Sequence, residues 1–313
     1  MKVKVFIDGS SGTTGLRIAD RLAERPEIEL LSISAEGRKD VHERAKVINS
    51  ADLAFLCLPD AASKEVMPLL RPDVKVLDTS TAFRTDAAWD YGFPELKGQK
   101  AKIQNSYRVA VPGCYASGFI SIARPLVELG LAPKDYPFSC TGISGYSGGG
   151  KKMIAEYESA DRPAHSKLDA PKSYGLGLAH KHLPEMKEIS GLAHTPMFVP
   201  VVCDYYCGMQ VLVPLDLTVA GTTAEAVAAG LADYYKDAAT VKVHALNEPL
   251  PENGLYSNAM AGTDRMELYL TVNAAGDQMM LVSLFDNLGK GSSGAAVQCM
   301  NLMLGLPETE GLE

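Results

Sequence analysis

Residues 3–15 read VKVFIDGSSGTTG, an apolar run followed by three glycines at three-residue intervals. The run over residues 3–7 has the length of a short strand, and the apolar residues after the glycines recur with helical spacing: Leu16, Ile18, Ala19, Leu22 and Ala23. The pattern predicts a strand, a glycine turn and a helix that begins at Thr13. Such a unit opens a sheet of strands that alternate with helices.

The same alternation continues through the first 113 residues. Residues 28–34, 52–58 and 74–78 predict three further strands, with helical stretches between them. Strands that alternate with helices form a parallel sheet with right-handed crossovers. We therefore expect the N-terminal part of the chain to be an α/β domain.

The glycines also carry a chemical signal. Gly9, Gly12 and Gly15 form a G-x-x-G-x-x-G turn between a strand and a helix, where the backbone approaches a pyrophosphate and the helix amides point at it. This predicts a dinucleotide site of the Rossmann type. A tight turn without a ligand is the alternative.

The residue that contacts the adenosine ribose is expected about 20 residues further on, at the end of the second strand. Ser34 occupies that place, with Arg38 and Lys39 just beyond it. A hydroxyl and two cations suit a 2′-phosphate and favour NADP(H) over NAD(H), although Glu36 lies nearby.

The sequence pattern changes after about residue 138. Longer, nearly alternating segments rich in β-branched residues predict a mostly antiparallel sheet, and they lie at residues 200–204, 209–218, 266–272 and 278–285. Residues 293–304 form a helical pattern that could return to the first domain, and residues 159–173 indicate a surface loop. The prediction is a Rossmann-type parallel-sheet domain (1–113 with 288–313) and an α+β domain (114–287).

Composition limits the kind of protein. The 313 residues hold 30 Lys+Arg against 38 Asp+Glu, and this net charge of −8 argues against a nucleic-acid partner. The chain lacks the run of about 18 apolar residues that a membrane span needs, and its start does not resemble a secretory signal. Its six irregularly spaced cysteines form no disulfide framework, so we expect a cytoplasmic protein. Cys203 and Cys207 could be half of a metal site, but strand-like residues between them favour an ordinary structural role.

Cys114 lies in the stretch VPGCYASG (111–118), directly before an apolar helical pattern. A cysteine at the start of a helix has its thiolate stabilised by unpaired amides, which makes it a candidate nucleophile. The alternative is a buried structural cysteine, a role that fits Cys57, Cys140 and Cys299 better.

His180 and His182 lie in the segment HKHLPE (180–185). Two histidines one residue apart could bind a metal on a strand, or one of them could be the general acid/base beside a thiol. No third metal ligand follows at a defined spacing, and the other four histidines lie scattered in polar or loop contexts. We expect no metal.

Six segments, in this order, resemble the N-acetyl-γ-glutamyl-phosphate reductases of the shorter type: DGSSGTTG (8–15), LDTSTAFRTDAAWDYGFPEL (77–96), VPGCYAS (111–117), SGYSGGGKK (144–152), HKHLPEM (180–186) and DNLGKGSSGAAVQ (286–298). The resemblance implies a cytoplasmic enzyme of arginine biosynthesis that takes a small-molecule substrate and NADPH. It also implies a homo-oligomer, a tetramer built as a dimer of dimers, whose second domain provides catalysis and subunit contacts.

The resemblance further implies residue roles. Cys114 would be the nucleophile, and His180, six residues after Tyr174, would be the acid/base, with a pKa near the working pH. The substrate residues would be Ser80, Arg84, Tyr174 and Lys181, with Arg84 clamping the acyl phosphate. The cofactor residues would be Gly9, Ser11, Gly12, Thr13, Thr14, Gly15, Ser34 and Arg38, then Ser144 and Gly145 in a loop near the nicotinamide, and Asn287 facing its carboxamide.

Two features depart from the wider family. Residues 37–49 are few for enclosing an adenine, and Lys181 replaces an arginine between the histidines. Two alternatives stay open: an aspartate-semialdehyde dehydrogenase, which shares the chemistry, and a non-catalytic NADP(H)-binding regulator.

Overall fold

The computed structural model describes residues 2–10 and 12–313. The chain separates into two compact units, a first unit of residues 1–113 with 292–312 and a second unit of residues 114–291 with 313. No helix in the described part of the chain has both the length and the apolar character that crossing a membrane requires.

The first unit contains a six-stranded sheet in the order β2-β1-β3-β4-β6-β5, and all its strand pairs are parallel. Its strands are β1 (Val3–Asp8), β2 (Ile28–Leu31), β3 (Leu53–Leu56), β4 (Lys75–Asp78), β5 (Asp90–Tyr91) and β6 (Arg108–Ala110). This confirms the parallel α/β fold class. The second strand ends at Leu31, three residues earlier than the apolar run suggested.

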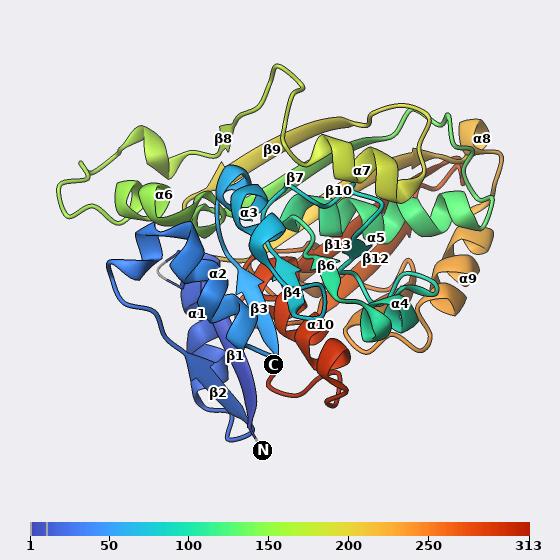
Figure 1. Ribbon diagram of the computed structural model, residues 1–313. Helices are drawn as coiled ribbons and strands as arrows, with labels where there is room; N and C mark the ends of the chain where they lie inside the picture. The colour runs from blue at the N-terminus through green and yellow to red at the C-terminus, as the bar shows by residue number, and fades with distance from the viewer. Residues whose placement is uncertain (1, 11) are drawn as a thin grey trace. The chain divides into compact units, whose positions relative to one another are not determined.

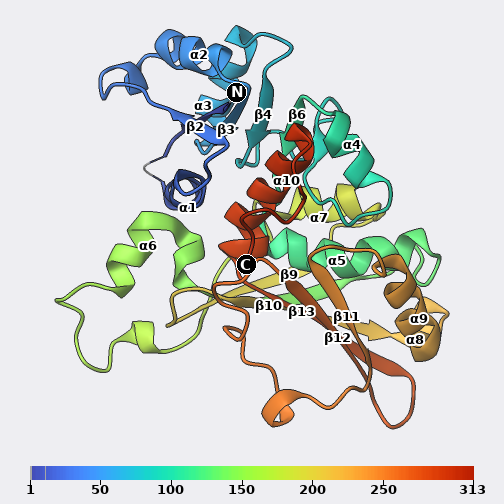
Figure 2. The same cartoon turned by 90° about the horizontal axis from the view of Figure 1, so that it is seen from below.

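Helices cover both faces of this sheet. They are α1 (Thr13–Ala23), α2 (Val41–Ser50), α3 (Asp60–Val66), α4 (Gln99–Asn105) and the returning helix α10 (Gly294–Leu304). Helices α1, α4 and α10 contribute to one apolar core and α2 and α3 to the other, and Figure 2 shows α1 and α2 on opposite sides of the strands. Helix α10 lies in the first unit and contributes to its core.

The second unit contains a seven-stranded sheet in the order β11-β12-β13-β10-β7-β9-β8. Its strands are β7 (Ser139–Gly145), β8 (Lys172–Ser173), β9 (Met197–Cys203), β10 (Met209–Asp216), β11 (Val241–Leu246), β12 (Met266–Val272) and β13 (Gln278–Phe285). Only the β11/β12 and β7/β9 pairs among these strands are parallel, which confirms the mostly antiparallel prediction.

The local structure of this unit differs from the sequence pattern in places. Residues 139–145 and 241–246 form strands that were not predicted. The predicted surface loop 159–173 is exposed over most of its length and ends in the short strand β8, which pairs with β9. Residues 204–207 form a bend and not a strand, because the carbonyls of Tyr205 and Tyr206 accept hydrogen bonds from the amides of Tyr146 and Ser147.

One face of the second sheet is covered by helix α5 (Cys114–Glu128), which contacts β10 and β13 and is flanked by α7 (Leu183–Ser190) and α9 (Ala224–Tyr234). Two shorter helices complete the unit: α6 (Gly150–Tyr157) and α8 (Leu217–Ala220). Figure 2 shows α5 on one side of the strands and the orange segment near residue 250 on the other, where Leu250, Leu255 and Met260 pack on the sheet.

Helix α5 approaches its sheet closely at Gly118. A Cβ atom there would lie 2.6 Å from Val211 Cγ2 and 2.7 Å from Ser283 Oγ. The Ser283 hydroxyl also donates a 3.1 Å hydrogen bond to the Gly118 carbonyl. This contact sets the height of α5 above the strands.

We expect the substitution Gly118→Ala to lower the free energy of unfolding by about 1–3 kcal/mol, because the added methyl group overpacks this contact. Equilibrium urea unfolding followed by circular dichroism measures the change. Gly254 is the matched control, since its Cβ would meet no atom within 4 Å. Gly254→Ala should leave stability unchanged or raise it by up to about 1 kcal/mol. Equal losses in both variants would contradict the packing argument.

Candidate active site

The glycine turn of the first unit has a distinct requirement at each glycine. Gly9 has a φ of +85°, and a Cβ there would lie 2.3 Å from the carbonyl oxygen of Cys57. A Cβ on Gly15 would lie 2.5 Å from the Gly9 oxygen, whereas one on Gly12 would meet no atom closer than 3.4 Å. The first and third glycines are therefore required by the turn's own packing. A Cβ on Gly12 would meet no close contact, and the Gly12 amide itself donates to the Gly9 carbonyl over 2.9 Å.

Two threonines follow this turn at the start of α1. Thr13 Oγ1 is buried and has no hydrogen-bond partner among residues 2–10 and 12–313. Thr14 Oγ1 lies 3.1 Å from Ser292 Oγ. Ser11, another predicted cofactor residue, lies outside the described residues. An unsatisfied hydroxyl at the start of a helix can donate a hydrogen bond to a phosphate oxygen. The turn therefore fits the predicted dinucleotide.

A pocket of about 370 Å³ lies beside the turn and is lined by Asp8, Gly9, Ser10, Ser32 and Arg38, among others. Ser34 is not part of this lining; it is exposed, and its Oγ accepts a 3.0 Å hydrogen bond from the Gly37 amide. Because β2 ends at Leu31, the residue directly after the strand is Ser32. The structure thus places Arg38 at the pocket together with Ser32, which the sequence analysis did not name, and the contact of Ser34 with the cofactor stays a prediction.

Ser80 and Arg84 lie beyond the end of β4. The Ser80 hydroxyl and amide both donate to Asp78 Oδ1, at 2.5 and 2.9 Å. Arg84 is buried, and it donates from Nε to the Val111 carbonyl (2.9 Å) and from Nη2 to the Thr79 carbonyl (3.0 Å). Two nitrogens of the predicted phosphate clamp therefore already hold the backbone, including the segment that leads to Cys114.

Cys114 is half-buried and is the first residue of α5, as the sequence predicted. Burial raises the pKa of both Tyr115 and Tyr174, and both phenols lie close enough to Cys114 for its charge to raise their pKa further. The Tyr174 hydroxyl lies 3.4 Å from the Tyr115 hydroxyl, and burial raises the pKa of Tyr174 to about 12. A neutral phenol thus accompanies the thiol at neutral pH.

The His180 ring completes this cluster. Its centroid lies 5.9 Å from both tyrosine rings, those of Tyr115 and Tyr174, and 5.1 Å from the ring of Phe198. His182 is buried, with its ring centroid 4.7 Å from that of His180. The structure therefore brings Cys114, Tyr174 and His180 together in the second unit, and adds Tyr115 and Phe198, which sequence reasoning did not single out.

The protonation of His180 differs from the expectation. Its Nδ1 accepts a 3.2 Å hydrogen bond from the His182 amide, which assigns the proton of the neutral ring to Nε2. Burial, reinforced by the charge of Lys181, lowers the pKa of His180 to about 4. This direction moves the pKa of His180 away from the working pH expected from the sequence, because the imidazole is partly buried among the rings of Tyr115, Tyr174 and Phe198.

Ser144, Gly145 and Asn287 lie elsewhere in the second unit. Ser144 and Gly145 are the last residues of β7 and not part of a loop. Asn287 is buried; its Oδ1 accepts from the Gly208 amide (2.8 Å) and its Nδ2 donates to Ser147 Oγ (2.9 Å). Its amide thus fixes the residues that follow β7, and its contact with a carboxamide stays a prediction.

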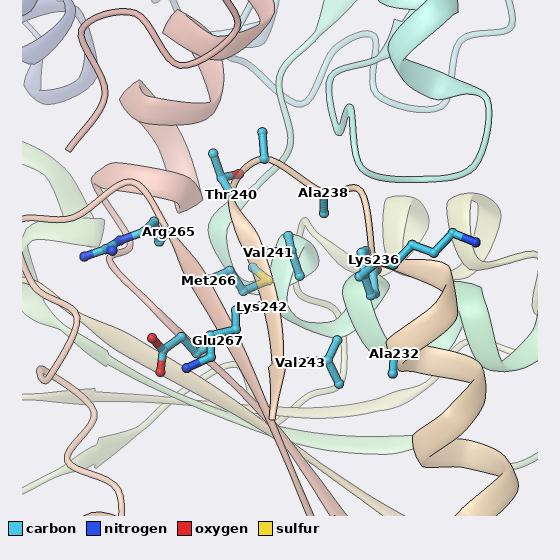
Figure 3. A pocket seen from close by; sticks show the side chains of 12 residues that line it. Ala232, Lys236, Ala238, Thr240, Val241, Lys242, Val243, Arg265, Met266 and Glu267 are labelled. Atoms are coloured by element: carbon cyan, nitrogen blue, oxygen red, sulfur yellow. The ribbon is translucent and has the colours of Figure 1, made fainter. Parts of the chain in front are cut away.

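A second pocket of about 400 Å³ lies between α9 and the strands β11 and β12 (Figure 3). Its lining includes Lys236, Lys242 and Arg265 but none of the predicted site residues. Arg265 and Lys236 point to opposite sides in Figure 3, and Lys236 bonds Asp233 at 3.0 Å. Cations that diverge in this way do not form an anion site. Among the described residues, no three His, Cys, Asp or Glu side chains are grouped so as to hold a metal ion.

We expect Lys181→Gln to raise the pKa of His180, because a positive charge beside the ring disfavours its protonation. The increase should be less than about one pH unit, since Lys181 is exposed and water screens its charge. Titration of the imidazole proton resonances by NMR measures it. Lys187→Gln, on α7, removes the same charge from a lysine that does not influence His180. An equal change in both variants would show that Lys181 has no specific effect.

Comparison with known proteins places both units in known families. Residues 114–287 match the semialdehyde dehydrogenase family, dimerisation domain, and residues 4–104 match its NAD binding domain. The aspartate semialdehyde dehydrogenase from Francisella tularensis has a similar fold, with a TM-score of 0.71 and 14% identity over 96% of this chain and 100% of that one. The Vibrio cholerae aspartate semialdehyde dehydrogenase II complexed with ASA also has a similar fold. Its TM-score is 0.67, with 17% identity over 97% of this chain and 99% of that one.

Sequence relatives are much closer. The chain is 46% identical to the N-acetyl-gamma-glutamyl-phosphate reductase of Trichormus variabilis over 99% of both proteins. It is also 46% identical to the enzyme of the same name from Burkholderia cenocepacia, over 96% of this chain and 97% of that protein. The chain therefore belongs to the N-acetyl-gamma-glutamyl-phosphate reductase family.

Proposed function

We propose that this protein uses NADPH to reduce N-acetyl-γ-glutamyl phosphate to N-acetylglutamate 5-semialdehyde, a step of arginine biosynthesis. The observation that carries the proposal is the cluster of Cys114, Tyr174 and His180 in a chain 46% identical, almost end to end, to enzymes named for this substrate. A thiol at a helix start beside a titratable ring suits acyl transfer.

Cys114 acts as the nucleophile. Its sulfur forms a bond to the acyl carbon, the bond from that carbon to the phosphate oxygen breaks, and phosphate leaves with the electron pair and takes up a proton. The product is a thioester on Cys114. The positive end of α5 favours both the thiolate and the oxyanion of this step.

When bound, NADPH supplies a hydride to the carbonyl carbon of the thioester. His180 then stabilises the resulting oxyanion through Nε2–H, and it can protonate that oxygen when the ring carries a second proton. The negative charge that develops on this oxygen favours the protonated form of the ring. On collapse of the intermediate the hydroxyl proton returns to His180, the carbon–sulfur bond breaks, and the aldehyde and the Cys114 thiolate are released.

The cofactor residues in this proposal belong to the first unit. The amides of the Gly9–Gly15 turn and the Thr13 hydroxyl would hold the pyrophosphate. Arg38, with Ser32 beside it in the pocket, would favour the 2′-phosphate of NADPH. These groups fit a dinucleotide because no protein atom closely approaches the Cβ position of Gly12 and the Thr13 hydroxyl is unsatisfied among the described residues.

The remaining roles are also proposals. Ser80, Arg84, Tyr174 and Lys181 would contact the substrate, with Arg84 both holding the Val111 carbonyl and attracting phosphate. Asn287, with Ser144 and Gly145, would lie at the nicotinamide. We further propose a cytoplasmic homo-oligomer, a dimer of dimers, whose contacts come from the second unit, in which residues 114–287 match a dimerisation domain.

The test follows NADPH formation in the reverse direction at alkaline pH, with N-acetylglutamate semialdehyde and phosphate and, in parallel, with aspartate semialdehyde and phosphate. We expect activity with the acetylated substrate only. Cys114→Ser should abolish it and leave NADPH binding nearly unchanged. Activity with aspartate semialdehyde only would show that the protein is an aspartate-semialdehyde dehydrogenase. A correctly folded wild-type protein that is inactive with both substrates would favour the non-catalytic NADP(H)-binding regulator.

The second variant pair separates the two histidines. We expect His180→Asn to lower kcat/KM at least about 100-fold, because it removes the donor at the acyl oxygen. His182→Asn should lower kcat/KM less than about tenfold, because that ring supports the cluster from its buried side. Thermal unfolding of each variant separates lost catalysis from lost fold. The reverse order in folded proteins would assign the acid/base to His182.

A further inference from the structure

A buried ion pair lies in the first unit where β1 ends and the glycine turn begins. Asp8 is the last residue of β1, and Arg44 lies in the middle of α2. Their side chains are 5% and 8% exposed, and Arg44 Nε donates to Asp8 Oδ2 over 2.9 Å. The proposed reaction assigns no role to this pair.

The pair joins three segments. The carboxylate of Asp8 accepts the amide of Gly9, and the backbone carbonyl of Asp8 accepts the amide of Cys57 over 2.8 Å. Arg44 also donates from Nη2 to the carbonyl of Ala62, in the first turn of α3, over 3.2 Å. The start of the glycine turn is thus fixed through one guanidinium group.

The charge of Asp8 makes this arrangement significant. Asp8, Gly9 and Ser10 all line the 370 Å³ pocket beside the turn. A carboxylate there has the same sign as a pyrophosphate and would repel it. Burial raises the pKa of Asp8, and the Arg44 guanidinium lowers it again and balances the charge of the ionised form.

We infer that Arg44 is a positioning residue for the dinucleotide: it compensates the charge of Asp8 and holds Gly9 so that the turn can accept a pyrophosphate. The inference rests on the proposed function only in taking NADPH as the ligand. Arg44 and Arg38 thus have different roles. The Asp8–Arg44 pair lies at the glycine turn, whereas Arg38 is proposed to contact the 2′-phosphate.

The test measures equilibrium binding of NADPH, and of NADH, by cofactor fluorescence in the full chain. Arg44→Gln should weaken binding of both nucleotides at least about tenfold, by the same factor, because it leaves an uncompensated carboxyl group under the pyrophosphate. Arg38→Gln should weaken the binding of NADPH but not that of NADH. Arg25→Gln is the matched control, since Arg25 is equally buried in the same unit and pairs with Glu27 away from the pocket lining.

Two more variants separate charge compensation from general damage. Asp8→Asn should leave NADPH binding unchanged or tighten it, and Asp8→Asn combined with Arg44→Gln should recover most of the affinity that Arg44→Gln loses. If Arg44→Gln does not fold, Asp8→Asn alone decides, because weakened binding in that variant contradicts charge compensation.

Wild-type affinity in folded Arg44→Gln, or no recovery in the double variant, would overturn the inference while the proposed function stands. A wild-type chain that bound neither nucleotide would overturn the proposed function, and the inference with it. Thermal unfolding of each variant confirms that the proteins compared are folded.

Discussion

The close contact between α5 and the second sheet is the constraint on which the reactive part of the molecule depends. Gly118 lets the helix lie so close to β10 and β13 that a Cβ there would lie within 3 Å of Val211 and Ser283 side-chain atoms. The first residue of that helix is Cys114, so the same contact fixes the thiol. Tyr115 then packs against Phe198 and His180, which come from other parts of the unit. Packing of a helix on a sheet therefore determines the geometry around the proposed nucleophile.

The glycine turn solves a different problem in the first unit. Contacts within the protein require glycine at positions 9 and 15, whereas the space beside Gly12 could hold a side chain. A turn shaped only by its own packing would require glycine at positions 9 and 15 but not at position 12. Thr13 directly follows Gly12, and its hydroxyl has no hydrogen-bond partner among the described residues. Both features indicate a ligand, and they are independent of the sequence relatives.

Much of this could be predicted because periodicity is a local property. Strands β12 and β13 and the starts of α1 and α5 agree with the sequence pattern residue for residue. Strand β7 reads SCTGISG, whose small residues give little strand signal; it forms because β9 and β10 pair with it on both sides. Ser32 was missed because the chain turns at Ser34, whose oxygens bond Gly37 and Arg38. The low pKa of His180 could not be predicted, since it depends on rings distant in the sequence.

Charge in the first unit is arranged differently from what the sequence suggests. From the sequence we expect cations to hold the phosphates, with Arg38 at the 2′-phosphate of the cofactor and Arg84 at the acyl phosphate. Yet Arg84 bonds the carbonyls of Val111 and Thr79, and Arg108 bonds those of Val74, Tyr107 and Arg71. The carboxyl groups of Asp8 and Asp78 are buried, which raises the pKa of each. In the proposed function, the pyrophosphate would therefore depend on backbone amides beside charge-compensated carboxyl groups, whereas exposed Arg38 would contact only the 2′-phosphate. Backbone dipoles suit this role because they are already oriented before the ligand arrives.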